Sequence, residues 1–242
     1  MNYLMIFAVV CAYIVKGMCG FANTLVFSTI LSFQANNINI TPIELILGYP
    51  SNLIIAWKER KSLSAKVWLP LTCLVIAGSI PGTFFLKNGN TTVLKIIFGF
   101  VVVIIGTEML FREFKNKNTK ASPFILGIIG LLSGLLCGLF GIGALLAAYV
   151  SRTTDTNSAF RGNLCIVFLI ENSFRIILYS FMGIITLKLI KTIILLVPFM
   201  IAGLAIGILL AKVMNEKIVK KVFTTMLILS GISLIINNIG II

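Results

Sequence analysis

Cysteine and glycine residues break two long apolar stretches of this chain, one in each half. The first break is Lys16-Gly-Met-Cys-Gly-Phe21, and the second is Gly134-Leu-Leu-Cys-Gly-Leu139. Irregular backbone at membrane depth is tolerated only where protein buries it or where it lines a cavity. Broken apolar helices at corresponding places in two halves are typical of a transporter's binding site.

The residues around both breaks suit an anion. A helix that restarts inside the membrane presents unpaired N–H groups and the positive end of its dipole, both of which favour negative charge. Glycines let the backbone approach a ligand closely, and Lys16 adds a positive charge with no acid near it in the sequence. We therefore expect an anion-binding site that contains Lys16, Gly20, Asn23, Gly138, Gly141 and Gly143.

Two thiols add a second hypothesis. Aligning the breaks at an offset of 118 residues makes Cys19 and Cys137 equivalent, so the pair could bind or relay a sulfur compound. The alternative, which we favour, is that each cysteine is a small apolar residue that lets helices pack. With no CxxC pair and no histidine in the sequence, we expect neither a metal site nor a cofactor.

Opposite charges also occur within an apolar segment. Glu171 and Arg175 lie four residues apart, the spacing of neighbours on one helix face. They could neutralise each other, or Arg175 could hold the anion while Glu171 carries a coupling proton. Asn172 adds a neutral donor to the substrate-binding set. Glu44 lies near a segment end, where snorkelling or capping is the better expectation.

Composition makes the chain an integral membrane protein. Of 242 residues, 59% are hydrophobic and 11% are charged, which is far outside the usual composition of soluble domains. The net charge of +13 comes from short clusters bordering apolar runs, so it reports topology, and we expect no nucleic-acid partner. Eight apolar segments follow from the polar punctuation, at about 2–33, 41–57, 67–86, 92–111, 122–150, 162–182, 189–211 and 218–240.

The second half of the chain repeats the first. Ile76-Ala-Gly-Ser-Ile-Pro-Gly82 matches Ile201-Ala-Gly-Leu-Ala-Ile-Gly207, and 93–98 matches 218–223 at the same offset of 125 residues. The expected units are therefore a four-segment repeat at 1–120 and another at 121–242. The glycines of the two matching segments are expected to let helices touch.

Charge counts favour one arrangement of these repeats. If segments one and five turn back as re-entrant hairpins, 14 of the Lys and Arg residues lie on one side and four on the other, with Lys16 and Arg175 left aside. With eight full crossings the split is 10 to 8, which the positive-inside rule does not explain. The hairpin form makes an all-α membrane protein of two inverted repeats; the alternative is eight transmembrane helices in two parallel repeats. In the hairpin arrangement, the four residues on the less positive side are Lys87, Lys95, Lys188 and Lys191.

The run Gly134-Leu-Leu-Cys-Gly-Leu-Phe-Gly-Ile-Gly143, together with Gly17-Met-Cys-Gly-Phe21 and the two Ile-Ala-Gly segments, resembles the TauE/SafE family of sulfite-exporter-type permeases. The resemblance implies a duplicated helical bundle that moves sulfite, sulfonates or related sulfur anions. The chain departs from the usual pattern at Ala144 and Leu145, where further glycine is common.

We therefore expect a multi-pass permease of the cell membrane, not an enzyme, that moves a small anion by alternating access. Its expected partners are the anionic substrate and the lipid bilayer, with homo-oligomerisation left open. A transmembrane thiol-disulfide electron carrier that uses Cys19 and Cys137 is the competing hypothesis. We expect no primary active transport, because the sequence has no GxxxxGK[ST] phosphate loop.

Overall fold

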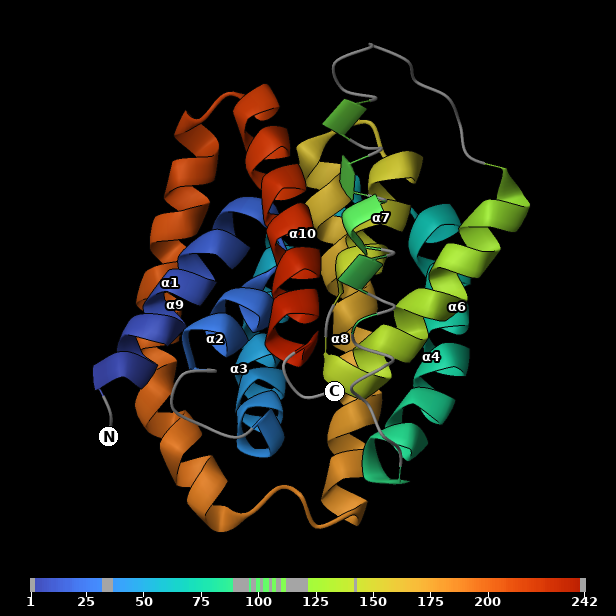
Figure 1. Ribbon diagram of the computed structural model, residues 1–242. Coiled ribbons are helices and arrows are strands. Elements are labelled where there is room, and N and C mark those ends of the chain that lie inside the picture. The colour runs from blue at the N-terminus through green and yellow to red at the C-terminus, as the bar shows by residue number, and fades with distance from the viewer. Residues whose placement is uncertain are drawn as a thin grey trace.

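A computed structural model describes residues 3–31, 37–88, 96, 99–100, 102–104, 106–107, 110–111, 122–141 and 143–239. Helices make up these residues almost entirely, and no strand occurs among them. The described residues between 96 and 111 are helical too. The helices are α1 (Tyr3–Cys19), α2 (Asn23–Leu31), α3 (Asn37–Lys58), α4 (Ala65–Asn88), α6 (Pro123–Phe140), α7 (Ala144–Thr153), α8 (Asn157–Phe181), α9 (Leu187–Val213) and α10 (Glu216–Ile239), with a 3-10 turn at Arg60–Ser62 (Figure 1).

The helices have the length and composition of a membrane protein. Three stretches are long and apolar enough to cross a bilayer, at Ala65–Gly82, Asn157–Phe181 and Leu187–Val213. Tyr3–Cys19 and Pro123–Gly138 are shorter apolar helices. Large apolar side chains cover the outside, including Phe124 at 76% exposure and Phe181 at 87%, as expected where lipid replaces water. The expectation of an all-helical membrane protein is confirmed.

Both broken segments fold back on themselves. Gly20 bends the first at φ 86°, followed by Ala22 at φ 72°, and Gly141 bends the second at φ 68°. Glycine takes this left-handed conformation without the penalty that a Cβ brings. After the first bend, Phe27 and Leu31 of α2 share a buried core with Ala8 of α1. A straight helix would hold Ala8 and Leu31 about 35 Å apart, so α2 returns along α1.

The two bends correspond at an offset of 121 residues. The Gly20 N–H donates to the Lys16 carbonyl at 2.6 Å, and the Gly141 N–H donates to the Cys137 carbonyl at 2.9 Å. In both places the next helix begins three residues later, at Asn23 and at Ala144. Lys16 and Cys137 therefore hold the same position relative to their bends.

The offset of 118 residues is accordingly wrong for the backbone, and so is the equivalence of Cys19 and Cys137. The alignment matched the letters Cys-Gly, but the second half bends at the next glycine along the chain, Gly141. The counterpart of Cys19 by the backbone is Phe140, so the two thiols are not a symmetric pair.

Glycines join the two halves where helices cross. A Cβ built at Gly82 of α4 would lie 2.6 Å from the carbonyl oxygen of Leu135 in α6. One built at Gly203 of α9 would lie 2.7 Å from the carbonyl oxygen of Val10 in α1. Each of these helices thus packs on the first arm of the other half's bent segment, and the prediction that these glycines let helices touch is confirmed.

Corresponding helices run in opposite directions. The Ser173 hydroxyl on α8 donates to the Tyr49 hydroxyl on α3 at 3.3 Å, while Asn163, ten residues earlier, bonds to Ser64 beyond the end of α3. These contacts make α3 and α8 antiparallel. In Figure 1, α1 and α3 rise while α6 and α8 descend, and α4 descends while α9 rises.

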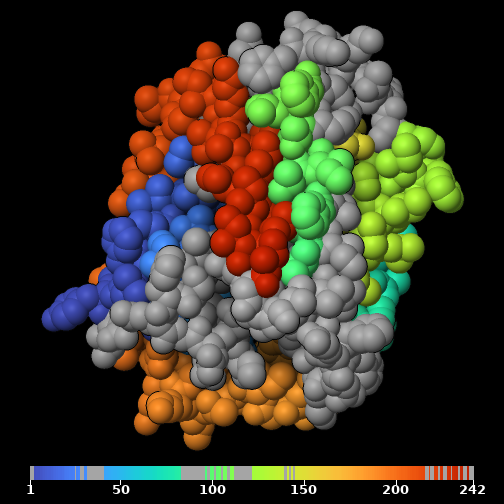
Figure 2. Space-filling model, viewed as in Figure 1, coloured from blue at the N-terminus to red at the C-terminus, as the bar shows by residue number. Residues whose placement is uncertain are grey.

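Positively charged connectors meet at one end of the bundle. The Ser64 N–H donates to the Asn163 Oδ1 at 2.9 Å, so the connector after α3 lies against the start of α8. Lys58, at the end of α3, interacts electrostatically with Arg161 and with Lys212 at the end of α9. On the face shown in Figure 2, α10 lies beside described residues of 96–111, where Gly99 and Gly231 contact each other's backbone.

Candidate functional site

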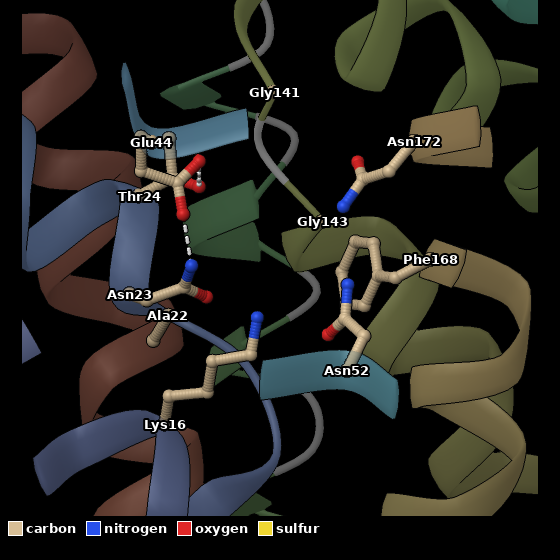
Figure 3. A pocket seen from close by; sticks show the side chains of 10 residues that line it. All are labelled: Lys16, Ala22, Asn23, Thr24, Glu44, Asn52, Gly141, Gly143, Phe168 and Asn172. Carbon is tan, nitrogen blue, oxygen red and sulfur yellow. Dashed lines mark hydrogen bonds between the residues drawn. The ribbon is translucent and has the colours of Figure 1, made fainter. Parts of the chain in front are cut away.

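A small cavity lies between the two bends. Segments from both halves line it: α1, the first bend with the start of α2, α3, the second bend, and α8 (Figure 3). Because α2 and α7 begin at the bends, their first backbone N–H groups lie beside this space. The lining residues are Lys16, Ala22, Asn23, Thr24, Glu44, Asn52, Gly141, Gly143, Phe168 and Asn172.

Lys16 supplies the positive charge of the cavity. Its side chain is 2% exposed, and its ammonium points into the space between Asn23 and Asn52 (Figure 3). The ammonium nitrogen lies 5.8 Å from the ring centroid of Tyr13 and 6.0 Å from that of Phe168. Aromatic faces attract a cation but leave its donors open, so the ammonium can still bind an anion.

Asn52 lines the cavity with an amide that the protein leaves unsatisfied. It is 1% exposed, and among the described residues neither its Nδ2 nor its Oδ1 has a hydrogen-bond partner. A buried amide without partners costs free energy that a ligand in the cavity would recover. Asn172 lines the same cavity from α8, 120 residues after Asn52, which is also the spacing between the starts of α3 and α8.

Glu44 contradicts the sequence expectation. It neither snorkels nor caps a helix end, because its side chain is 5% exposed and lines the cavity. Its Oε2 accepts from the Thr24 hydroxyl at 2.7 Å, and its Oε1 accepts from the Asn23 amide. Glu44 therefore fastens α3 to the start of α2. The signal that could have found it is an ionisable residue inside an apolar segment, which marks function by default.

Glu171 and Arg175 form a buried pair beside the cavity rather than in its wall. Arg175 Nε lies 3.6 Å from Glu171 Oε1, with the side chains 2% and 1% exposed. Arg175 also donates to the Tyr179 hydroxyl at 3.1 Å. A Cβ built at Gly141 would lie 3.2 Å from Arg175 Nη1, so the guanidinium sits directly against the second bend.

The predicted residues divide into two groups. Five line the cavity together: Lys16, Asn23, Gly141, Gly143 and Asn172. The others lie outside its wall. Gly20 sits against the Arg161 stem and accepts from the Cys165 thiol at 3.5 Å, while Gly138 contacts Ser79 of α4. Cys19 and Cys137 are fully buried in one hydrophobic cluster.

Sequence reasoning missed Asn52, Thr24, Ala22 and Phe168 as cavity residues. Phe168 explains why residue 143 is a glycine, because a Cβ there would collide with the phenyl ring. An aromatic residue in an apolar helix gives no signal of its own in a single sequence. Asn52 is a lone amide in an apolar segment, and this feature of the sequence was a weak indication of a functional residue.

Comparison with known families settles the class of protein. A family model of the sulfite exporter TauE/SafE matches residues 5–234, nearly the whole chain. The chain belongs to the TauE/SafE family. No curated protein and no solved structure matches it. As a member of this transporter family with long apolar helices, it is a multi-pass membrane permease.

The TauE/SafE match fits the chemistry of the cavity. A sulfur oxyanion offers several acceptor oxygens, and Lys16, Asn52 and Asn172 offer cationic and amide donors around one space. Among the described residues, no group of three His, Cys, Asp or Glu side chains could hold a metal ion.

Proposed function

We propose that this TauE/SafE permease moves a small sulfur oxyanion, of the sulfite, thiosulfate or sulfonate type, by alternating access at the cavity between the two bends. The observation that carries the proposal is the pairing of buried Lys16 with buried Asn52, whose amide atoms have no partner among the described residues. Charge and unsatisfied hydrogen-bonding capacity in one cavity select a polar anion. The family supplies the sulfur chemistry.

The polar groups of the cavity have different roles in this proposal. Lys16 binds the anion, and Asn52 and Asn172 orient its oxygens, since an ammonium is a point charge whereas amides have directional donors. Cys19, Gly20, Cys137, Gly138 and Arg175 act behind this wall, where Arg175 adds positive potential at the second bend.

A carboxyl group in an anion site points to proton coupling. Glu44 lies in the wall itself, so a negative carboxylate there opposes the anion, and protonation removes that opposition. Glu171, which pairs with Arg175 beside the cavity, is the proposed second proton carrier. Loading of the anion and of a proton would then favour each other.

We also propose that the two halves are inverted repeats with re-entrant bent segments. The direction of the helices and the return of α2 along α1 support this arrangement. Eight full crossings would place connectors 58–66 and 151–161 on opposite faces, whereas Ser64 and Asn163 are hydrogen-bonded. The pair of labels that would separate the two topologies most directly, at 1 and 36, lies outside the described residues.

Nothing in the described residues favours the thiol-disulfide carrier. A carrier needs thiols that meet a partner's cysteine, but Cys19 and Cys137 are both at 0% exposure and neither lines the cavity. The small-residue interpretation accounts for both. We propose that the permease resides in the bacterial cell membrane, either alone or as a homo-oligomer.

Transport by purified protein in liposomes tests the function. We expect radiolabelled sulfite to leave loaded vesicles at a rate that Lys16→Gln lowers at least about tenfold, the effect of losing roughly 1.4 kcal/mol of binding. Lys191→Gln, which removes an exposed cation of α9, is the matched control and should transport normally. Equal rates for both variants would refute the cavity as the substrate site. Thermal stabilisation by sulfite, thiosulfate, sulfate and sulfonates then ranks the substrates.

A further inference from the structure

Arg161 is a buried cation that the transport site does not use. Arg161 lies in the second turn of α8 and is 6% exposed. Its Nε and Nη2 are buried without a hydrogen-bond partner, and no ion pair to it occurs among the described residues. A buried guanidinium without partners is costly, so the empty donors indicate a missing anionic partner.

The surroundings of Arg161 are positive. Its stem packs on the first bend, with Cγ 3.1 Å from a Cβ built at Gly20. Partial burial, together with the positive charges of Arg161 and Lys212, lowers the pKa of Lys58, which follows the apolar segment at 41–57. Glu59, whose Cβ lies 3.1 Å from a Cβ built at Gly162, offsets these positive charges in part.

We propose that Arg161 is the centre of a second anion site, which receives a free tetrahedral or pyramidal oxyanion at the end of the bundle where the charged connectors meet. Its planar fork suits sulfate-like groups, and Lys58 and Lys212 raise the local concentration of such anions. A lipid phosphate has the same chemistry. The side chain packs inward on the first bend, however, so a free anion is the expected occupant.

The second site is distinct from the cavity. Arg161, Phe168 and Asn172 follow one face of α8 at helical spacing, so Arg161 lies about 10 Å along the axis from Phe168. Phe168 belongs to the cavity wall, and Arg161 does not. If the proposed function and topology hold, this site lies on the cytoplasmic side and receives the anion before the cavity does. Anion binding by Arg161 does not depend on either proposal.

Thermal unfolding of the full-length protein in a phosphate-free detergent tests the site. Sodium sulfate is the probe, and sodium gluconate at matched ionic strength is the control for screening. The variants are Arg161→Gln, Arg161→Lys, Lys16→Gln and the double variant Lys16→Gln with Arg161→Gln. Arg60→Gln, an exposed arginine on the same connector end, is the matched control.

An anion site predicts a specific pattern of midpoints. Without sulfate, Arg161→Gln should unfold about 2 °C or more above wild type, because it removes an unpaired buried charge. It should lose at least half of the rise that sulfate gives wild type, whereas Arg161→Lys and Arg60→Gln keep it. Lys16→Gln should retain a sulfate-dependent rise that the double variant lacks.

Other results would overturn the proposal. A lower midpoint for Arg161→Gln without sulfate, including failure to fold, would make Arg161 a structural cation. An equal rise in Lys16→Gln and the double variant would remove the second site, as would no response of wild type to sulfate. A rise that depends on Arg161 with short-chain phosphatidylglycerol but not with sulfate would assign the site to lipid. If Lys16→Gln keeps the full wild-type rise, it is the central cavity that fails, and Arg161 is judged on its own variants.

Discussion

Asn52 and Glu44 line the same cavity, but the protein satisfies only one of them. Glu44 receives hydrogen bonds from Thr24 and Asn23, while both amide atoms of Asn52 lack partners among the described residues. Removing a satisfied buried group leaves its partners stranded, whereas removing an unsatisfied one relieves a desolvation cost. The hydrogen bonds of Glu44 thus fasten α3 to α2 in the ligand-free protein, whereas the amide of Asn52 is available to a ligand.

Asn52→Leu should weaken sulfite binding about tenfold or more without destabilising the ligand-free protein. The leucine side chain has a similar volume and leaves no unsatisfied amide, so the unfolding midpoint should stay equal or rise. Asn163→Leu is the matched control, because Asn163 is fully buried but bonds to Ser64, Ser62 and Ala159. It should cost about 1–3 kcal/mol of stability and leave the affinity of the folded protein unchanged. Thermal unfolding with and without sulfite measures both, and the reverse pattern would make Asn52 structural.

The buried pair of Glu171 and Arg175 gives a second prediction at this scale. Arg175→Gln should destabilise by about 3 kcal/mol, since it leaves the Glu171 carboxylate buried without its cation. Adding Glu171→Gln should recover most of that loss. A folded double variant that no longer transports sulfite would give the pair a functional role. Normal transport would reduce it to a structural pairing and leave the site to Lys16 and the cavity amides.

At the scale of helices, glycine sets how closely the two halves approach. A Cβ at Gly207 would collide with the carbonyl oxygen of Ile14, and one at Gly134 would collide with that of Val75. Backbone atoms cannot move aside as flexible side chains do, so these crossings tolerate no side chain. By contrast, nothing lies within 4 Å of a Cβ built at Gly127.

Gly207→Ala should therefore lower stability by about 2 kcal/mol or more through overpacking at the crossing of α1 and α9. Gly127→Ala places the same methyl group in open space on a helix and should raise stability by about 0.5–1 kcal/mol. Thermal unfolding in detergent compares the two variants directly. Equal effects would mean that glycine acts at Gly207 only through helix propensity.

The sequence predicted these elements well because its signals at this scale are strong. Long apolar runs, polar punctuation and the paired glycine segments located the helices to within a few residues and identified their contact faces. The register of the bends was not predictable in the same way. The letters Cys-Gly recur 118 residues apart, whereas backbone geometry selects Gly20 and Gly141, the glycines of the two breaks that stand at positive φ.

The contents of the cavity were predictable only in part, for a related reason. A charge, an amide or a glycine in an apolar segment identified five of the lining residues: Lys16, Asn23, Gly141, Gly143 and Asn172. Asn52, Glu44 and Phe168 join them from α3 and α8 through tertiary packing that one sequence does not reveal. Position within a segment suggested a capping role for Glu44, but its contacts with α2 decide its place.

At the scale of the whole molecule, the antiparallel course of α3 and α8 agrees with the proposed topology, in which two crossings, α4 and the segment at 92–111, separate them. Equivalent helices can face each other across the cavity in opposite directions only if the halves are inverted. An inverted pair can exchange conformations between two faces of the membrane, which is the physical basis of alternating access. The positive charges then collect at one end, as the connectors do around Arg161.

Topology gives the last prediction, and exposed connector residues make it testable. Lys61→Cys, Lys188→Cys and Asn215→Cys place single labels on three connectors, in a background where Cys11 and Cys73, the cysteines that are not buried, are replaced by alanine. With re-entrant bent segments, three crossings separate 61 from 188, counting 65–88, 96–111 and 157–181. A membrane-impermeant maleimide should then react with Lys188→Cys from outside intact cells and with the other two only after permeabilisation. Eight full crossings would instead place 61 and 188 on one face and 215 on the other. Reaction of Lys61→Cys and Lys188→Cys from the same side would therefore refute the inverted arrangement, because a bent segment that crosses the membrane adds the one crossing that reverses everything after it.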